Sequence, residues 1–574
     1  MYDIPVIPAQ PRQNLCNRIG GGVFWLQSGL AAFSGALLAL AFPPLELGML
    51  AWVALVPLLL APVPMTLGRR IWVGYLFGAV HFIISLWWLN TIGFCAGVLL
   101  GLICAFFPMA WYLLVSSLMR RMPGDDPAMA PNTRHPWDLS GFRQCLWMLA
   151  AAAAWVALEW VRSWFFTGFP WNQLGVSQWS LRSLLLLTTI TGVYGISFLV
   201  VAVNIALAIS WARFGRLFVV QPGRSAGLLS WPMAVAMLLV LPVFILIVTQ
   251  KVPTLPDMTL RAGTIQGCLP QCRMWTQEQY DESLRVYSVL TREVASAGKP
   301  NLIVWPETAI PASFDDPAYA AMRERVFSRM DIPLLAGAID RRPAVRDPRP
   351  DAADDWLEFN SAILLDGNGK RLQSYDKTHR VPFGEYTPFA KQLPWLERLI
   401  GMGRGLTPGR EFTVFNLPNN VRGGVMICYE DAFPGIAREF TRRGADILVT
   451  LTNDSWYAES AGSRQHLLHA VFRAAENNRP LLRAGNNSDT CLILPDGRIT
   501  SLVLDKRNGN RFIRAWTVLE VPVWRNQPLT WYAKHGDVFA RACAGLAAAC
   551  LLWIFFRVWR TRRAMLDKVA PPPK

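Results

Sequence analysis

Hydrophobic residues are distributed unevenly along the chain. Long apolar runs with few charged residues fill 23–249 and return near the C-terminus, whereas 250–537 is mixed in polarity. A helix needs roughly 20 apolar residues to cross the hydrocarbon core of a bilayer. The pattern predicts eight transmembrane helices, at 23–42, 46–64, 71–90, 94–118, 144–163, 184–210, 228–249 and 538–556. We therefore expect a seven-helix membrane domain over 23–249, a polar domain over 250–537 and an eighth helix over 538–556.

Arginine and lysine predict the orientation of these helices. Cytoplasmic loops of membrane proteins are enriched in both residues. Alternate loops here are basic, and the loops between them hold almost no Lys or Arg; the basic positions include Arg12, Arg18, Arg69, Arg70, Arg120, Arg121, Arg213 and Arg216. The N-terminal segment 1–22 and the basic tail 557–574 are therefore predicted to be cytoplasmic, with 250–537 on the outer face. The formal charge of +16 follows largely from this topology and does not favour nucleic-acid binding.

The predicted membrane domain contains few polar side chains that could carry chemistry. Apart from Glu46, Arg162 and Arg541 near the helix ends, only His81 and Glu159 could carry a charge inside the predicted helices, which argues against an ion or proton pathway. Each is expected to be a paired interior group or to lie near the interface. The outer loop 164–179 is rich in aromatic residues. It suits either a plain aromatic belt at the headgroups or a lipid-facing surface next to the outer domain.

The middle of the chain alternates short β-rich runs with amphipathic runs. Such alternation, mixed with hairpins, predicts a mixed sheet covered by helices. Strands are expected at 258–266, 301–305, 333–340, 423–431 and 446–454, hairpins at 361–377 and 491–504, and helices at 276–298, 434–444 and 463–478. Leu284, Tyr287, Leu290 and Val294 would form the apolar face of the first of these helices. The segment 341–355 has no apolar period and predicts a surface loop.

Three residues follow predicted strands or hairpins in this domain. Glu307 follows NLIVWP, Lys377 follows the first hairpin, and Cys428 ends GGVMIC. Singly, such residues are usually a solvated carboxylate, a surface lysine and a core cysteine. Together they suit nucleophilic catalysis. A thiol is only partly ionised near its free pKa of ~8.5, so a carboxylate can take its proton and a lysine can stabilise the oxyanion. Backbone N–H groups from Tyr429 onward could add donors, and the product would be an acyl-thioester.

The motifs around these residues resemble a known superfamily. WPETAIP, YDKTHRVPFGEYTP and ICYEDAF occur in the order of the Glu-Lys-Cys triad of the nitrilase superfamily. VPFGEYTP and TNDSWYAESAGSRQHLLHAVFRAAENNRPLLRAGNN resemble one branch, the apolipoprotein N-acyltransferases. LALAFPPLELGMLAWVALVPLL, GYLFGAVHFIISLWWL and ALEWVRSWFFTGFPWNQLG resemble membrane segments of that branch. The resemblance implies an αββα sandwich behind eight transmembrane helices.

The resemblance also implies a reaction. An acyl chain would pass from the sn-1 position of a phospholipid, usually phosphatidylethanolamine, to Cys428. A ping-pong cycle would then deliver it to the α-amine of a diacylglyceryl-cysteine at the N-terminus of an apolipoprotein. The reaction would occur at the outer face of the bacterial inner membrane and would be catalysed by a monomer without metal or cofactor.

Roles are carried over from the motifs to matching positions. Glu307 would be the base, Lys377 the oxyanion stabiliser and Cys428 the nucleophile. Supporting roles fall to Glu385, Tyr429 and Glu430, and a lipid contact to Trp275. The chain departs from the family pattern at Ser488, where glycine is expected, at Tyr457-Ala458, where an aromatic-glycine pair is usual, and at Cys268 and Cys272, where no cysteine is expected.

Other interpretations remain open from the residues. One is a membrane-anchored amidase in which water resolves the thioester. Another is a scaffold or transport protein whose outer domain only binds. His466 and His469, three residues apart, could suit a metal but lack partners at suitable spacing. Arg473, Arg479 and Arg483 are expected to pair with internal carboxylates, and Cys268 could pair with Cys272 in an oxidising compartment.

Overall fold

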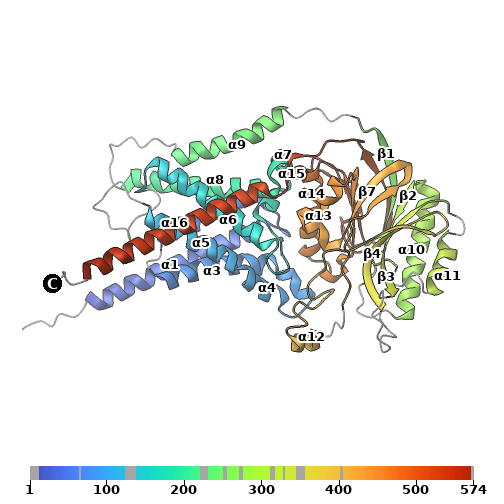
Figure 1. Cartoon of the computed structure of the whole chain (residues 1–574), viewed down its shortest axis with the longest axis horizontal. Helices are drawn as coiled ribbons and strands as arrows, with labels where there is room; N and C mark the ends of the chain where they lie inside the picture. The colour runs from blue at the N-terminus through green and yellow to red at the C-terminus, as the bar shows by residue number, and fades with distance from the viewer. Residues whose placement is uncertain are drawn as a thin grey trace, which may run out of the picture.

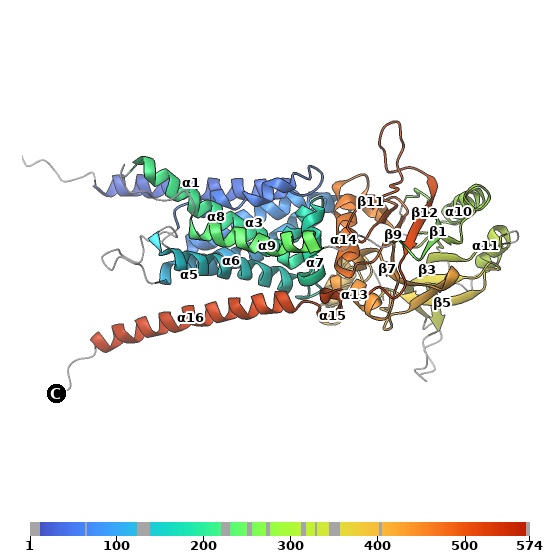
Figure 2. The same ribbon diagram turned by 90° about the horizontal axis from the view of Figure 1, so that it is seen from above.

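The fold was analysed in a computed structural model of the whole chain. The structure describes residues 12–63, 66–122, 138–219, 230–249, 255–270, 276–310, 317–327, 330–343, 356–400 and 405–569. Apolar helices form one end of the elongated molecule and a layered α/β domain forms the other, as Figures 1 and 2 show from two directions. The C-terminal helix returns to the helical end and lies along it.

The helical end is built mainly from long apolar elements. These are α1 (Arg12–Leu40), α2 (Val56–Leu60), α3 (Leu67–Ser85), α4 (Ala96–Cys104), α5 (Phe106–Arg121), α6 (Gly141–Arg162), α7 (Arg182–Thr191), α8 (Val193–Val219), α9 (Trp231–Thr249) and α16 (Val538–Val569). Within the described residues, six helical segments are long and apolar enough to cross a membrane: Gly22–Leu40, Ala96–Arg121, Gly141–Arg162, Val193–Phe214, Trp231–Thr249 and Val538–Arg563. They overlap six of the predicted transmembrane helices.

The second predicted transmembrane helix, 46–64, is not one continuous helix. It consists of a 3-10 helix, Gly48–Trp52, and the five-residue α2, which begins with Pro57 at its first turn. Backbone groups freed by this break need other partners in an apolar environment. The side chain of Asn204 accepts from the Leu55 N–H (2.9 Å) and donates to the Ala51 carbonyl (2.8 Å). Ser34 accepts from the Leu58 N–H in the same way (2.9 Å). The prediction missed the break because the composition alone is uniformly apolar.

Two further predicted helices differ in outline. The sixth, 184–210, is interrupted at Gly192, whose backbone is left-handed (φ 64°), so α7 and α8 are separate. The third, 71–90, is the 19-residue α3 followed by a 3-10 turn. A count of eight transmembrane helices therefore stays a prediction, as do the predicted domain limits.

The α/β domain contains two six-stranded sheets. The first has the order β12-β1-β2-β3-β4-β5 and the second β11-β10-β9-β8-β7-β6. Their strands are β1 (Met258–Gln266), β2 (Leu302–Val304), β3 (Leu334–Pro343), β4 (Trp356–Leu365), β5 (Arg371–Asp376), β6 (Val414–Leu417), β7 (Val421–Ile427), β8 (Ile447–Thr452), β9 (Leu481–Gly485), β10 (Cys491–Ile493), β11 (Ile499–Thr500) and β12 (Ala515–Val523). The helices are α10 (Gln277–Gly298), α11 (Pro317–Phe327), α12 (Pro394–Ile400), α13 (Pro434–Arg442), α14 (Ala461–Asn477) and α15 (Trp531–His535).

These layers form the αββα sandwich that the resemblance implied. The helices α10 and α11 cover the outer sheet, while α13 and α14 lie between the inner sheet and the membrane helices (Figure 1). Side chains alternate across a strand. Leu302 and Val304 of β2 accordingly belong to the cluster between the sheets, and Ile303 and Trp305 to the cluster under α10. The predicted apolar face of α10 is confirmed, since Leu284, Tyr287, Leu290 and Val294 are all buried.

Most predicted strands and helices of this domain are confirmed within a few residues. The interior strand β9, the edge strands β6 and β12, and the short helices α11, α12 and α15 were not predicted. β12 pairs antiparallel with β1 along its whole length, from Met258–Val523 to Gln266–Ala515. The predicted surface loop 341–355 lies mostly outside the described residues, and its first three residues extend β3.

Polar contacts join the two parts of the molecule. The side chain of Gln465, on α14, accepts from the indole N–H groups of Trp88 (2.9 Å) and Trp171 (2.8 Å). Its amide group donates to carbonyl oxygens of Pro43 and Ser85, so one glutamine binds three segments of the membrane domain. Arg464 adds an ion pair with Glu46 (2.7 Å). These contacts orient α14, and with it the residues packed beneath the predicted nucleophile.

Candidate active site

The three predicted catalytic residues come from three different strands. Glu307 follows β2, Lys377 follows β5, and Cys428 follows β7 of the other sheet. All three side chains are buried, with exposed fractions of 6%, 1% and 7%. Burial of two charged side chains is costly unless they are paired and hydrogen-bonded. Their partners therefore define the site.

Lys377 lies between two carboxylates. Its Nζ is 2.9 Å from Oε1 of Glu385 and 3.4 Å from Oε1 of Glu307. The side-chain amide of Asn360, on β4, donates to the same two oxygens, at 2.7 Å for Glu307 and 2.9 Å for Glu385. The carbonyl oxygen of Asn360 also accepts from the Lys377 N–H (2.8 Å). One asparagine therefore orients both carboxylates and the backbone of the lysine.

Glu307 is held from the second sheet as well. Its Oε2 accepts from the backbone N–H of Asn453, 2.9 Å away, just after β8. The carboxylate of Glu385 is also held by its own loop, because its Oε2 accepts from the Val381 N–H (2.7 Å). In each carboxylate, one oxygen therefore accepts hydrogen bonds from the Lys377 and Asn360 side chains, and the other oxygen accepts from a backbone N–H.

Cys428 occupies a sharp turn. Its φ is +53°, a left-handed conformation that is uncommon for non-glycine residues and often marks functional sites. A 3-10 helix, Cys428–Ala432, follows directly and separates β7 from α13, where the sequence predicted one helix after the strand. The turn projects the side chain out of the strand while the backbone continues into helical turns.

Burial and the nearby Glu307 favour the neutral form of Cys428 at rest. Burial raises the pKa of the Cys428 thiol well above its ordinary range, and the charge of Glu307 raises it further, while Lys377 lowers it. For Lys377, burial lowers the pKa, but Glu385, Glu307 and Cys428 oppose it, and the pKa is raised overall. The arrangement holds a protonated thiol beside a carboxylate and a lasting positive charge. Proton transfer from thiol to carboxylate would then create the nucleophile when it is needed.

Glu430 ties the lysine loop to the nucleophile turn. Its Oε1 accepts from the Tyr375 hydroxyl (2.8 Å), from the backbone N–H and hydroxyl of Thr378 (2.7 and 2.8 Å) and from the His379 N–H (3.1 Å). Its Oε2 accepts from the Ile427 N–H (2.9 Å). Residues on both sides of Lys377 and the residue before Cys428 are thus fixed to one buried carboxylate.

Tyr429 faces the membrane domain instead. Its hydroxyl donates to the carbonyl oxygen of Gly168 (3.2 Å), and its ring stacks on Trp171 at 6.2 Å between centroids.

The outer loop 164–179 has an exposed part and a buried part. Trp164, Phe165 and Phe166 are exposed, as in an interfacial belt, whereas Trp171 is buried against the nucleophile turn.

A buried ionic cluster lies under the nucleophile turn. His466 contacts Asp454 (Nδ1–Oδ1, 2.8 Å) and Asp431 (Nε2–Oδ1, 2.9 Å), and its Nε2 is 3.2 Å from the Cys428 carbonyl oxygen. Arg483 contacts the same two carboxylates at 2.7 and 3.0 Å. Burial lowers the pKa of His466, but Asp431 and Asp454 outweigh it and raise the pKa to about 9. His466 is therefore an imidazolium that accompanies two aspartates, and the expected pairing of Arg483 with internal carboxylates is confirmed.

The remaining positions that the sequence singled out lie either outside the described residues or in loops near the site. Trp275 and Cys272 lie outside the described residues. Cys268 donates its thiol hydrogen to Asn487 (3.2 Å). Ser488 donates a hydroxyl to Asp454, and Ala458 has a positive φ of +49°, a conformation that glycine adopts more readily than alanine. Within the described residues, no group of three or more His, Cys, Asp or Glu is placed to hold a metal ion.

Sequence reasoning missed two members of the site. Asn360 lies inside a strand, with no motif around it, and only the strand pairing of β4 with β5 places it beside Lys377. His466 was considered only as a possible metal ligand. Its ion-pair partners Asp431 and Asp454 are distant in sequence, so the sequence did not indicate the ionic cluster. Both are recognisable only once the sheets are assembled.

Comparisons with known proteins show which family the chain resembles over most of its length. The profile of the apolipoprotein N-acyltransferase N-terminal domain matches residues 34–206, and the carbon-nitrogen hydrolase profile matches 261–509. Apolipoprotein N-acyltransferase of Geobacter metallireducens is 31% identical over 92% of this chain and 95% of its own. That of Gloeobacter violaceus is 32% identical over 91% and 93%. The chain belongs to the apolipoprotein N-acyltransferase family.

Relatives of this family resemble the chain over both its parts. Apolipoprotein N-acyltransferase of Chlorobaculum tepidum is 29% identical over 91% of this chain and 95% of its own. Among solved structures, an amidase of the nitrilase superfamily from Nesterenkonia covers 51% of this chain and 98% of its own, with 16% identity and a TM-score of 0.34. Family membership makes the chain a membrane acyltransferase with a carbon-nitrogen hydrolase domain.

Proposed function

We propose that this acyltransferase works through a Cys428 thioester, with Glu307 as general base and Lys377 as oxyanion stabiliser. The observation that carries the proposal is the position of Lys377. Its ammonium and the side-chain amide of Asn360 both contact Oε1 of Glu307, and its positive charge lowers the pKa of Cys428. Glu307 takes the thiol proton as the sulfur attacks an ester carbonyl. The ammonium of Lys377 then faces the negative charge that develops on the carbonyl oxygen.

The acyl donor is a membrane phospholipid, with phosphatidylethanolamine as the main substrate and its sn-1 ester as the bond that breaks. The S–C bond of the thioester forms as the ester C–O bond breaks, and Glu307 returns the proton to the leaving alkoxide. The product released at this stage is a lysophospholipid. A site directly above membrane helices supports a lipid donor, because Tyr429 contacts the outer loop of the membrane domain.

The acyl acceptor is the α-amine of the diacylglyceryl-cysteine at the N-terminus of an apolipoprotein. Here Glu307 accepts a proton from the attacking amine, the amide C–N bond forms as the thioester C–S bond breaks, and Glu307 gives the proton to the leaving sulfur, which restores the Cys428 thiol. The second half-reaction requires that water be excluded until the amine arrives. The low exposure of Glu307, Lys377 and Cys428 supports such protection.

Supporting roles follow from the contacts. Glu385 and Asn360 position Lys377 and Glu307, while Glu430 fixes the lysine loop to the nucleophile turn. Trp275 is proposed to contact the lipid. No metal or cofactor has a part in this mechanism.

We further propose that the chain is a monomer in the bacterial inner membrane, with the α/β domain on the periplasmic side and both termini in the cytoplasm. The distribution of arginine supports this orientation. Arg120 and Arg121 end α5 and the basic stretch of α16 lies at the same end of the bundle, away from the α/β domain (Figure 1).

A reconstituted transfer reaction tests the proposed function. The purified chain is mixed in vesicles with phosphatidylethanolamine carrying an isotope-labelled sn-1 chain and a diacylglyceryl-cysteine peptide. Mass spectrometry of the peptide should find one labelled amide-linked chain with the wild-type chain and none with Cys428→Ala. Release of labelled free fatty acid, with the peptide unmodified, would indicate hydrolysis by a membrane-anchored amidase and would contradict the proposal.

A further inference from the structure

The carbonyl oxygen of Cys428 is held by a side chain to which the proposed mechanism gives no role. His466 lies on α14, is fully buried, and places its ring nitrogen Nε2 3.2 Å from this oxygen. A carbonyl oxygen can only accept a hydrogen bond, so Nε2 carries a hydrogen and donates it. The backbone of the nucleophile is therefore bound directly to α14.

The other ring nitrogen fixes the orientation of His466. Nδ1 lies 2.8 Å from Oδ1 of Asp454, and a carboxylate oxygen also only accepts. Arg483 is 3.2 Å from Nδ1, but it binds Oδ2 of the same aspartate at 3.0 Å. Oδ1 of Asp431 lies 2.9 Å from Nε2 and supplies a second negative charge. His466 is thus a charged donor with a hydrogen on each nitrogen, and the hydrogen on Nε2 is directed at Cys428.

A single peptide unit links the held carbonyl to the next backbone N–H. The unit between Cys428 and Tyr429 is planar and trans, so its C=O and N–H point in opposite directions. The C=O points at α14, which lies on the side of the inner sheet that faces the membrane helices (Figure 1). Glu307 and Lys377 follow strands of the outer sheet, on the opposite side. The N–H of Tyr429 is therefore directed toward the side from which the base and the lysine approach.

This N–H is suited to stabilise the oxyanion of the proposed reaction. It belongs to the residue directly after Cys428, whose sulfur attacks the ester carbonyl. A backbone donor with a fixed direction stabilises the developing negative charge without reorganisation. If the peptide unit turned over, the carbonyl oxygen of Cys428 would face the same negative charge and repel it. The direction of this one peptide unit therefore decides whether it helps or hinders the reaction.

The turn at Cys428 needs outside support to keep that direction. Its φ of +53° lies in a region that non-glycine residues occupy only when the surrounding structure holds them there. Hydrogen bonds from a charged donor are roughly twice as strong as neutral ones. The contact from His466 is of this charged kind and lies in the buried interior of the domain. It is accordingly well placed to hold the peptide unit.

We propose that His466 is a positioning residue for acyl transfer, which holds the carbonyl oxygen of Cys428 and so directs the N–H of Tyr429 at the oxyanion beside Lys377. This role rests on the proposed thioester reaction and adds to it a donor whose direction is set from α14. It serves both half-reactions, because an oxyanion forms when the thiolate attacks the ester and again when the amine attacks the thioester.

Two neutral substitutions separate the donor from the charge. In His466→Asn the side-chain amide reaches only the position of Nδ1, whereas in His466→Gln it reaches about the position of Nε2 and can still donate to Cys428. Both variants lose the imidazolium, so a purely structural role of the ionic cluster would affect them alike. Thioester formation from phosphatidylethanolamine, followed in single turnover at saturating lipid, should fall about 10- to 100-fold in His466→Asn and stay at least about fivefold faster in His466→Gln.

Alkylation of Cys428 by iodoacetamide provides a second readout. The S–C bond forms as the C–I bond breaks and iodide leaves, so no oxyanion develops. The alkylation rate, mapped to the peptide that contains Cys428, depends on the thiolate and should stay within about twofold of the wild-type rate in both variants. Loss of folding or of the thiolate would slow both reactions, whereas a misdirected oxyanion donor slows acylation alone.

The matched control is His469→Asn, the same change at the other buried histidine of α14, whose ring packs on Trp171. It should keep acylation within about threefold of wild type, since it does not alter the donor to the nucleophile turn. All variants are assayed below the lowest of their melting temperatures. Equal acylation in His466→Asn and His466→Gln, or equal slowing of alkylation and acylation, would overturn the role of His466.

The remaining outcomes also decide. If His466→Asn does not fold, His466→Gln is compared with wild type, and a loss of acylation beyond about 100-fold with unchanged alkylation would contradict a role carried by the donor. Absence of a thioester on the wild-type chain would overturn the proposed function and the role of His466 with it. A wild-type thioester, with no difference between the two variants, would overturn the role of His466 alone.

Discussion

The side-chain amide of Asn360 donates a 2.7 Å hydrogen bond to Oε1 of Glu307, and that oxygen also faces the ammonium of Lys377. The second hydrogen of the same amide is shared with Glu385. A neutral strand residue thereby arranges two carboxylates around one lysine. The base and the positive charge of the proposed mechanism depend on this arrangement for their relative position.

Asn360→Ala should slow thioester formation about 10- to 100-fold, since general base catalysis contributes about 10²- to 10⁴-fold when the base is correctly held. The apparent affinity for phospholipid should change little. Single-turnover kinetics over a range of lipid concentration separates the two. Ser374→Ala, in the adjoining strand β5, is the matched control. A variant with an unchanged rate, or with a change only in lipid affinity, would contradict the role of Asn360.

Glu385→Gln should alter the pH dependence of acylation. Glu385 is the strongest of the groups that raise the pKa of Lys377, so its neutralisation lowers that pKa. A lysine with a lower pKa loses its charge at a lower pH, and the alkaline decline of the acylation rate should begin earlier than in the wild-type chain. A pH–rate profile of thioester formation measures the shift. An alkaline limb that stays in place, or moves upward, is the opposite outcome.

His466 should make stability depend on alkaline pH. Its pKa is raised to about 9 from an ordinary value of 6.5, with Asp431, Asp454, Arg483 and the neighbouring His469 around it. A group with a raised pKa stabilises the fold fully below the unfolded pKa, and this contribution is lost as pH rises through the folded pKa. The melting temperature should therefore fall between about pH 7 and pH 10.

The variant His466→Gln isolates this effect. It should melt at a lower temperature at pH 7 and show a weaker decline toward pH 10, because no imidazolium is left to lose its proton. Differential scanning fluorimetry in one detergent across the pH range makes the comparison. Parallel curves for the two proteins would exclude His466 as the source of the pH dependence.

Labelling of two introduced cysteines, measured against the wild-type chain with its ten cysteines, tests the proposed topology. Asn508→Cys lies on an exposed loop of the α/β domain, and Thr561→Cys lies on the exposed basic part of α16. A membrane-impermeant maleimide added to intact spheroplasts should modify the first and reach the second only after lysis, relative to the wild-type background. The reverse pattern would place the α/β domain in the cytoplasm.

The sequence predicted most of the α/β domain because its patterns are local. A strand such as β2 is a short apolar run, and α10 has a clear apolar face from Leu284 to Val294. The edge strand β12 was missed because only its pairing with β1 stabilises it as a strand. The interrupted second membrane helix was missed for a similar reason, since Asn204 satisfies its freed backbone from 149 residues away.

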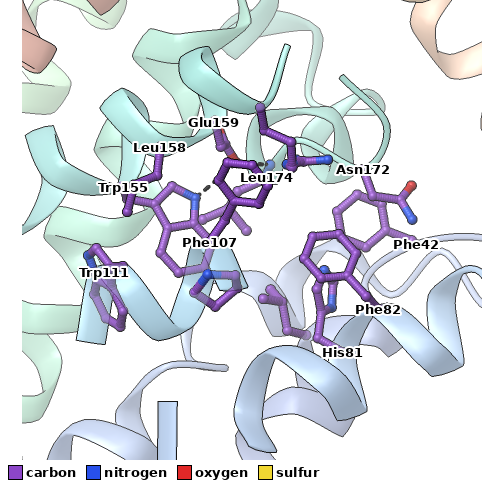
Figure 3. A pocket seen from close by; sticks show the side chains of 13 residues that line it. Phe42, His81, Phe82, Phe107, Trp111, Trp155, Leu158, Glu159, Asn172 and Leu174 are labelled. Atoms are coloured by element: carbon purple, nitrogen blue, oxygen red, sulfur yellow. Dashed lines mark hydrogen bonds between the residues drawn. The ribbon is translucent and has the colours of Figure 1, made fainter. Parts of the chain in front are cut away.

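The candidate site was predictable to the extent that motifs mark it. Glu307, Lys377 and Cys428 each follow a recognisable strand or hairpin in a specific segment of sequence. Asn360 and His466 act through partners on other elements, so their positions depend on sheet register and helix packing. A small cavity in the membrane domain, lined among others by His81, Glu159 and Asn172 (Figure 3), is equally dispersed in sequence, because these residues lie on three separate segments.

The central claim is that Cys428 carries an acyl chain between two lipids. The most direct measurement is intact-mass spectrometry of the purified chain after incubation with phosphatidylethanolamine and no acceptor, beside the Cys428→Ala variant. The account predicts one fatty-acyl adduct that maps to Cys428, disappears with hydroxylamine and is absent from the variant. A folded wild-type chain with no adduct at any time, or an equal adduct on Cys428→Ala, would contradict it.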